Sequence, residues 1–205
     1  GPRQSTVGAA QHLVEQQKVK SITCVAPGIP GFGDWVCGGV EAYGKTVNVA
    51  VKSVIFDPGA LDGNAIALQI AAAKSEGVVL GMPRGMMLPI LTAAEQQDLG
   101  KTMKLGLPTS AYHADMPKAV GKYWAGKTIV HMELQPMDQD SPDNNNWKAV
   151  MNKYGAKSDP RDTFSQAGYL AAKVATEALM GIKGTIDRKA VFEAFKGVKN
   201  FRSDM

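Results

Sequence analysis

The chain has 205 residues, of which 44% are hydrophobic and 20% charged, and its formal net charge at pH 7 is +4. This length suits one or two domains, and the composition is ordinary for a globular protein. Basic side chains are scattered singly, without the run or stripe that nucleic-acid binding needs. No apolar stretch approaches the roughly 20 residues of a membrane span. We therefore expect no nucleic-acid partner and no membrane-spanning segment.

Strand-like and helix-like segments alternate through the first two thirds of the sequence. The chain opens with a predicted helix, Ser5–Gln17, in which Ser5 is the expected N-cap. The predicted strands are Ser21–Ala26, Val49–Phe56, Gly77–Leu80, Met103–Leu107 and Lys127–Leu134. The predicted helices between them are Asp34–Gly44, Gly63–Ser75, Gly85–Leu99 and a short piece at Met116–Tyr123. This alternation predicts an α/β fold with a parallel, doubly wound sheet of about five strands flanked by helices.

The last third of the sequence differs in composition and in predicted secondary structure. Residues Gln135–Asn146 are polar and broken by proline, which is typical of a loop. Only helices are expected after them, at Trp147–Tyr154, Arg161–Met180 and Asp187–Lys196. We therefore predict an α/β ligand-binding lobe over 1–134, a hinge-like loop over 135–146 and a helical segment over 147–205. Because the chain opens in a helix and has no strand after its final helix, we expect it to be a piece of a longer protein.

Four of the predicted strands end in loops rich in Gly, Pro and small polar residues. We name them the first edge loop (Pro27–Gly33), the second edge loop (Asp57–Gly63), the third edge loop (Gly81–Gly85) and the fourth edge loop (Pro108–His113). The carboxyl ends of parallel strands meet at one edge of the sheet, so these loops should be neighbours. Open α/β sheets bind their ligands at that edge.

The cysteines and histidines suggest neither a cofactor nor a metal. Cys24 falls in a predicted strand and Cys37 in the first turns of the next helix, so a disulfide is geometrically conceivable. Two free buried thiols are the favoured interpretation, because free Cys behaves as a small hydrophobe. His12, His113 and His131 are far apart in sequence and lack a second ligand at useful spacing.

The order of these features resembles that of a known family. Gly33-Asp34 at a helix start is followed by Asp57–Asp62, then by Gly81–Arg84, and much later by Phe164–Val174. This order resembles the leucine/isoleucine/valine-binding type of periplasmic solute-binding protein, the type I receptors of ABC importers. The resemblance covers about Ser5–Met205, but it corresponds to only the second half of such a protein.

The resemblance implies a non-enzymatic receptor lobe in the periplasm. Such a lobe captures a small ligand for the membrane subunits of an ABC importer, and two lobes close on the ligand by hinge motion. In that family the helices after the fifth strand largely cover the first lobe. We therefore expect an exposed apolar face here, which either a homodimer buries or the helices cover by folding back onto their own sheet. The expected face consists of Phe164, Tyr169, Val174, Phe192 and Phe195.

The resemblance also implies ligand contacts at Phe32, Pro83, Arg84, Thr109 and Ser110. The residue types at the same strand ends add Met82 and Tyr112 to the predicted contacts. Thr109 and Ser110 fall near a position where amino-acid receptors hold an acid that meets the ligand's ammonium group. Since no acid stands there, a plain α-amino acid is disfavoured. A planar, bidentate clamp at Arg84 suits a carboxylate ligand, and an aromatic one if Phe32, Trp35 or Tyr112 stacks on it. Met82, Met86 and Met87 would supply an adaptable wall.

The main alternative is an NAD(P)-binding Rossmann-type enzyme domain. Gly28, Gly31 and Gly33 follow a strand, and Asp57 ends the next one, where a ribose-binding acid would lie. Pro27 and Pro30, however, remove two backbone donors from any phosphate cradle. The spacing Gly-x-x-Gly-x-Gly also differs from that of the dinucleotide fingerprint.

A hydrolytic triad of Ser110, His113 and Asp115 is disfavoured as well. The three residues sit within one short stretch, and no Gly-x-Ser-x-Gly motif occurs anywhere in the chain. We therefore predict no catalytic residue.

Overall fold

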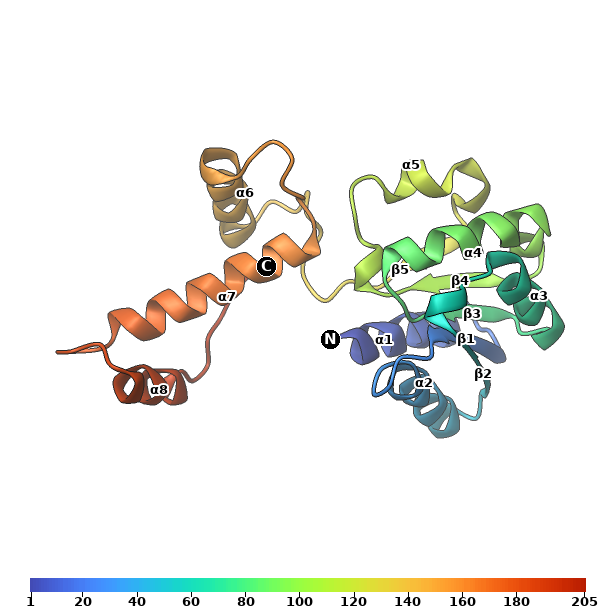
Figure 1. The fold of residues 1–205 in the computed structure, drawn as a ribbon, viewed down its shortest axis with the longest axis horizontal. Helices are drawn as coiled ribbons and strands as arrows, with labels where there is room; N and C mark the ends of the chain where they lie inside the picture. The colour runs from blue at the N-terminus through green and yellow to red at the C-terminus, as the bar shows by residue number, and fades with distance from the viewer. The chain divides into compact units, whose positions relative to one another are not determined.

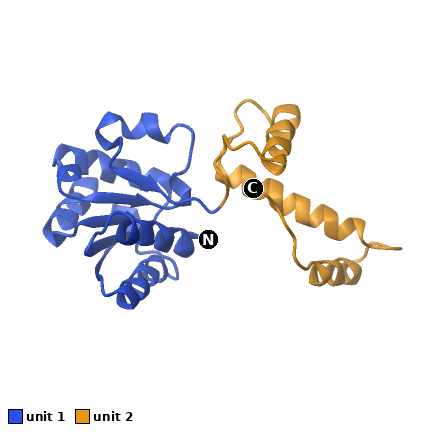
Figure 2. Cartoon of the chain, turned by 180° about the vertical axis from the view of Figure 1, so that it is seen from behind, with its two compact units in different colours: residues 1–133 blue, residues 134–205 orange.

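The structure is a computed structural model that describes residues 1–205. The chain divides into two compact units, residues 1–133 and 134–205, shown in different colours in Figure 2. Unit 1 is an α/β domain, and unit 2 contains only helices and loops. No helix combines the length and apolar character that a membrane crossing requires.

Unit 1 is built on a single parallel sheet of five strands. The strands are β1 (Ser21–Pro27), β2 (Ala50–Phe56), β3 (Gly77–Leu80), β4 (Lys104–Leu107) and β5 (Thr128–Val130). They lie in the order β2-β1-β3-β4-β5, and every neighbouring pair is parallel. The predicted fold class is therefore confirmed. The interior strands β1 and β3 are almost wholly buried, because helices cover both faces of the sheet, and this explains their continuous apolar runs.

Helices lie on both faces of this sheet (Figure 1). They are α1 (Pro2–Glu15), α2 (Gly33–Val47), α3 (Gly63–Ala73), α4 (Arg84–Gln96) and α5 (Met116–Val120). Single 3-10 turns occur at η1 (Pro58–Ala60), η2 (Leu99–Lys101), η3 (Thr109–Ala111) and η4 (Lys122–Trp124).

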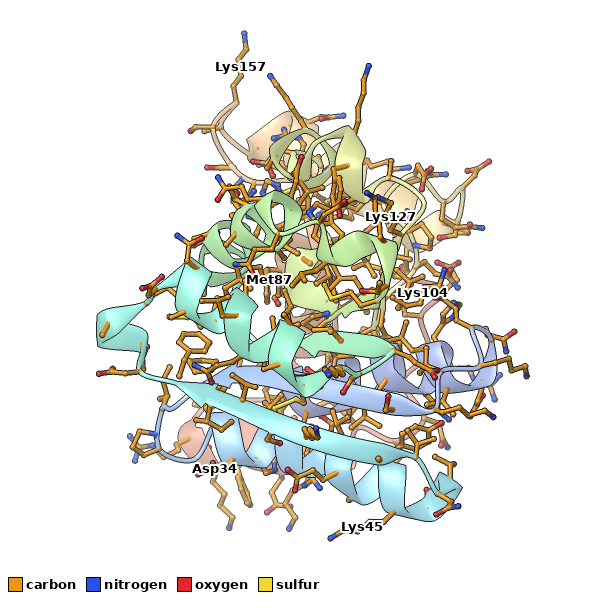
Figure 3. All side chains as sticks on the ribbon, turned by 90° about the vertical axis from the view of Figure 1, so that its right-hand side faces the viewer. Asp34, Lys45, Met87, Lys104, Lys127 and Lys157 are labelled. Atoms are coloured by element: carbon orange, nitrogen blue, oxygen red, sulfur yellow. A yellow bond between two sulfur atoms is a disulfide. The ribbon has the colours of Figure 1, made fainter.

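Two hydrophobic cores result. Leu13, Ile22 and Val40 belong to the core under α1 and α2. Met87 belongs to the core under α3, α4 and α5, and Figure 3 shows it in the packed interior while Lys45 points away from α2.

The first helix begins earlier than predicted, and Ser5 is not its N-cap. Helix α1 starts at Pro2, since proline suits the first turn of a helix, where its missing N–H costs nothing. Ser5 therefore lies in the second turn and is fully buried. Its Oγ accepts a hydrogen bond of 2.5 Å from the backbone N–H of Thr109. The residue expected to cap a helix instead ties α1 to the fourth edge loop.

The fifth strand is shorter than the predicted Lys127–Leu134. Strand β5 covers only Thr128–Val130, and the N–H of His131 makes one further hydrogen bond of 2.8 Å to Leu107 O. Its one neighbour in the sheet, β4, ends at Leu107. Residues 132–134 therefore have no strand to pair with.

The two cysteines form a disulfide, so the favoured free-thiol interpretation is wrong. Cys24 and Cys37 are bridged, with their Cα atoms 5.6 Å apart, and no cysteine in the chain is free. Helix α2 packs directly on β1, which brings the two side chains together in the core under α1 and α2. The sequence distinguished poorly between the two states, because a buried thiol and a buried disulfide occupy similar apolar positions.

Unit 2 consists of α6 (Pro142–Tyr154), α7 (Thr163–Met180) and α8 (Arg188–Gly197). Helix α6 begins five residues before the predicted Trp147, because Pro142 and Asp143 both favour a first helical turn. At the start of α7, Asp162 and Ser165 form a reciprocal capping box.

Unit 2 is held together by polar contacts as well as by its few buried apolar side chains. The Asp143 carboxylate accepts hydrogen bonds of 2.6 Å from both Lys173 Nζ and Ser203 Oγ, which ties the chain's last residues to α6 and α7. The Asn144 amide donates to the carbonyls of Pro136, Met137 and Gln139.

Candidate functional site

The strand order places a topological switch point between β1 and β3. The chain passes from β1 to β2 on one side of β1, and β3 lies on its other side. In sheets of this order, ligands bind in the crevice outside the carboxyl ends of the two strands at the switch point. The first edge loop follows β1 and the third edge loop follows β3. Phe32 and Arg84, predicted from the sequence as contacts, therefore belong to the two loops that flank the crevice.

The first edge loop makes a compact turn. Phe32 N–H donates to Ile29 O at 2.9 Å, and Gly28 N–H donates to Phe56 O at 2.7 Å. Gly31 has a φ of +73°, in the left-handed region that glycine tolerates. The side chain of Phe32 is partly exposed, and α2 begins directly after it, at Gly33. An aromatic ring is thus available at the edge of the crevice.

The third and fourth edge loops are joined to each other. Ser110 Oγ donates a 2.9 Å hydrogen bond to Met82 O. Arg84, the first residue of α4, forms an ion pair through Nη1 with Asp115 Oδ1, just beyond the fourth edge loop. Because Ser110 reaches the third edge loop and Arg84 reaches the segment just after the fourth, the two loops form one wall of the sheet edge.

Arg84 sets the electrostatics of this wall. The hydrogen bond from Arg84 is the largest influence on the Asp115 carboxyl and lowers its pKa below the ordinary value of 3.8. His113 Nδ1 lies 2.5 Å from the same carboxylate oxygen and lowers that pKa further when the ring is protonated. Asp115 thus stays ionised and holds one end of the Arg84 guanidinium, a group with five N–H donors in all.

The other predicted contacts differ in their accessibility. Pro83 is exposed at the N-cap of α4, and Ser110 is partly exposed. Thr109 is only 8% exposed, and its N–H is bonded to Ser5. Met82 is 2% exposed and belongs to the core under α3, α4 and α5, so its side chain faces the interior.

Tyr112 has a different setting from Arg84. It lines an apolar cavity of about 340 Å³ between the α5 region and β5, together with Met116, Trp124 and Val130. Arg84 and Phe32 do not line this cavity. The sequence predicts Tyr112 and Arg84 as contacts of the same ligand, whereas in the structure the two side chains have different neighbours.

Asp115 is the residue of this edge whose role the sequence reasoning missed. In the sequence it stands out only as a member of the disfavoured hydrolytic triad. The structure does bring His113 and Asp115 together, but the Ser110 hydroxyl donates to Met82 O instead. The signal available in the sequence was an acidic residue just after the fourth edge loop together with an arginine in the third edge loop, since these loops were expected to be neighbours.

The geometry opposes a dinucleotide site. The N–H groups of Phe32 and Gly33, where α2 begins, both donate to Ile29 O within the first edge loop, at 2.9 and 3.3 Å. The Asp57 carboxylate accepts from Gly59 N–H at 2.8 Å and caps η1. These donors and this acid are therefore committed to the turns themselves. Across residues 1–205, no group of three or more His, Cys, Asp or Glu side chains is placed to hold a metal ion.

An open α/β sheet of this order, with its loops gathered at a switch point, is typical of a ligand-binding lobe. The family model described as periplasmic binding protein matches residues 1–205, so the chain belongs to the periplasmic binding protein family. The resemblance noted in the sequence is thereby confirmed. This is a family of binding proteins rather than a class of enzymes. A search of curated proteins found no match.

Solved structures of similar fold include three bacterial receptors. An extracellular ligand-binding receptor from Verminephrobacter eiseniae aligns with a TM-score of 0.80 and 24% identity, over 95% of this chain and 55% of that one. An ABC-transporter solute-binding protein from R. palustris, in complex with 4-hydroxybenzoate, aligns with a TM-score of 0.78 and 20% identity, over 94% and 52%. A possible leucine/isoleucine/valine-binding protein from Rhodopirellula baltica aligns with a TM-score of 0.83 and 16% identity, over 100% and 56%. The chain thus spans little more than half the length of these structures.

Proposed function

We propose that this chain forms one wall of the ligand cleft of a solute-binding receptor, and that its ligand is a small carboxylate, preferably an aromatic one. The receptor delivers the ligand to the membrane subunits of an ABC importer and catalyses no reaction. The ligand contacts that we propose are Phe32, Pro83, Arg84 and Ser110. Thr109 lies in the same loop, but its side chain is not accessible to a ligand.

The single observation that carries this proposal is the setting of Arg84. It begins α4 beside the switch point, and its side chain is 32% exposed. Asp115 is the acidic group bound to it and uses Nη1 only. A guanidinium held at one end in this way is pre-oriented, and its remaining N–H donors suit a planar carboxylate.

Two further observations support an aromatic carboxylate over an α-amino acid. Thr109 and Ser110 carry no negative charge, so the fourth edge loop offers no charged partner for an ammonium group at those positions. Phe32 presents a partly exposed ring from the loop on the other side of the switch point. The R. palustris protein of similar fold, in complex with 4-hydroxybenzoate, provides a precedent for such a ligand.

The disulfide supports a periplasmic location. Disulfides form and persist in oxidising compartments, of which the bacterial periplasm is one, and are rare in the cytosol. A bridge between Cys24 and Cys37 is therefore in keeping with a receptor that works outside the inner membrane.

The test is a titration of the ¹⁵N-labelled chain followed by amide chemical shifts. We expect 4-hydroxybenzoate to shift the amides of Arg84, of Phe32 and of the residues near them, and leucine to shift them much less. The affinity should be weak, because enclosure supplies most of a pocket's contact area and one wall encloses little. Arg84→Gln should weaken binding by roughly 10- to 150-fold, the equivalent of about 1.5–3 kcal/mol for hydrogen bonds to a charged group.

The matched control is Arg188→Gln, which makes the same charge change in unit 2 and should leave binding unchanged. Equal responses to leucine and 4-hydroxybenzoate would contradict the ligand class. Micromolar binding of NAD that is lost in Asp57→Ala would instead support the dinucleotide-binding alternative.

A further inference from the structure

The first edge loop has few hydrogen bonds to the rest of unit 1. The bond from Gly28 N–H to Phe56 O is the one that ties residues 28–32 to another strand. The other bonds that these residues donate stay within the loop. Pro27 and Pro30 have no N–H to donate. At its far end, α2 begins without any side-chain cap.

The other edge loops are secured by side chains. In the second edge loop, Asp57 caps η1, and Asp62 accepts from the N–H groups of Asn64 and Ala65 at the start of α3. The third and fourth edge loops are joined by the Ser110 and Arg84 contacts described above. The first edge loop, which carries Phe32, has no comparable polar attachment.

A covalent link takes the place of those contacts. Cys24 lies in the middle of β1 and Cys37 in the first turns of α2, and both are buried, at 0% and 1% exposure. The bridge spans 13 positions of sequence and encloses the whole first edge loop and the residues of α2 that precede Cys37. Whenever the loop opens, Cys24 and Cys37 therefore stay held together in the core.

We propose that the Cys24–Cys37 disulfide is the positioning element of the first edge loop, and that it holds Phe32 and the start of α2 at the switch point. A cross-link restricts the conformations open to the chain it encloses, which disfavours states in which the loop and the first turn of α2 detach together. Without the bridge, one interstrand hydrogen bond and local packing remain. The consequence for ligand binding rests on the proposed function, whereas the effect on the loop does not.

The test compares hydrogen exchange in three forms of the chain. These are the oxidised protein, the same protein unfolded, reduced and refolded under reductant, and the Cys24→Ala/Cys37→Ala variant. In the two forms without the bridge, the hydrogen-bonded amides of this region should exchange at least tenfold faster; these are Gly28, Ile29, Phe32, Gly33 and Val36. The amides of residues 64–70, at the start of α3, form the internal control and should change little. Reoxidation should restore slow exchange in the reduced protein and have no effect on the variant.

A uniform acceleration across β1, β3 and α3 would overturn the proposal, because it would mean that the bridge contributes only global stability. Unchanged exchange at residues 28–36 would overturn it as well. The reduced protein retains every other side chain, so the comparison stands even if the double variant folds poorly. A final arm measures 4-hydroxybenzoate binding in the oxidised and reduced forms, and a several-fold loss on reduction is expected. If the oxidised form does not bind this ligand, the proposed function fails while the exchange result still decides the role of the disulfide.

Discussion

Substitution of Gly33 tests whether the first edge loop closes as tightly as the structure indicates. A Cβ added at Gly33 would lie 2.1 Å from Pro27 O and 3.0 Å from Pro27 C. Ordinary contacts between carbon and a carbonyl oxygen begin at roughly 3.3 Å, so the start of α2 and the end of β1 would have to separate by about 1.2 Å. Pro27 O and Pro27 C are backbone atoms, so they cannot move aside as a flexible side chain could. The nearby disulfide also resists the separation of α2 from β1.

Gly33→Ala should therefore destabilise unit 1 by about 1–3 kcal/mol, the usual cost of forcing extra volume into a packed region. Gly38→Ala is the matched control. Gly38 lies in the same helix, its added Cβ would meet nothing within 4 Å, and replacing glycine by alanine in a helix interior stabilises by about 0.5–1 kcal/mol. The two substitutions should thus differ by roughly 1.5–4 kcal/mol, in opposite directions from the wild type.

The assay is urea unfolding followed by the intensities of the β1 and β3 amide resonances, which report on unit 1 alone. If Gly33→Ala is as stable as the wild type, the close approach of α2 to Pro27 is wrong. A loss in Gly38→Ala equal to that in Gly33→Ala would also refute the reasoning, because backbone freedom rather than contact would then explain both.

Two further predictions concern the charge pair and the helices. The pKa of Asp115 should be below 3.8, principally because Arg84 donates to it, and Arg84→Gln should return it toward 3.8 in an NMR carboxyl titration. The pKa of Asp115 is lower in the folded than in the unfolded chain, so its ion pair stabilises the folded state fully above pH 3.8. This stabilisation is lost as the pH falls through the folded-state pKa. An unchanged Asp115 pKa in Arg84→Gln would contradict the assignment. In unit 2, Phe164 and Phe192 are 62% and 61% exposed, so the chain should self-associate at low micromolar concentration in size-exclusion chromatography with light scattering. Phe192→Glu should shift it toward a 21.8 kDa monomer, and a wild-type monomer at that mass would refute the prediction.

Much of the fold could be predicted because its signals are local. Gly77–Leu80 was bounded correctly by an apolar run between a turn and a glycine, and β1, β2 and β4 were located to within one residue at each end. The β5 boundary was wrong because its length depends on where β4 ends, a property of the neighbouring strand. The polar, proline-broken stretch before Trp147 predicts a loop, yet α6 starts within it, because Pro142 and Asp143 suit a first helical turn.

By itself, the sequence determined the alternation of strands and helices, the parallel sheet and the single edge at which the loops gather. These follow from hydrophobic periodicity and turn residues, which act over a few neighbouring positions. Only the tertiary structure decided which groups meet: Asp115 with Arg84 at that edge, the Ser5 hydroxyl with the Thr109 N–H, and Cys24 with Cys37 in the core. Two of these pairs join residues from loops or helices well separated in sequence, and the third depends on how α2 packs on β1. Such pairings follow from strand order and helix packing, which no local pattern encodes.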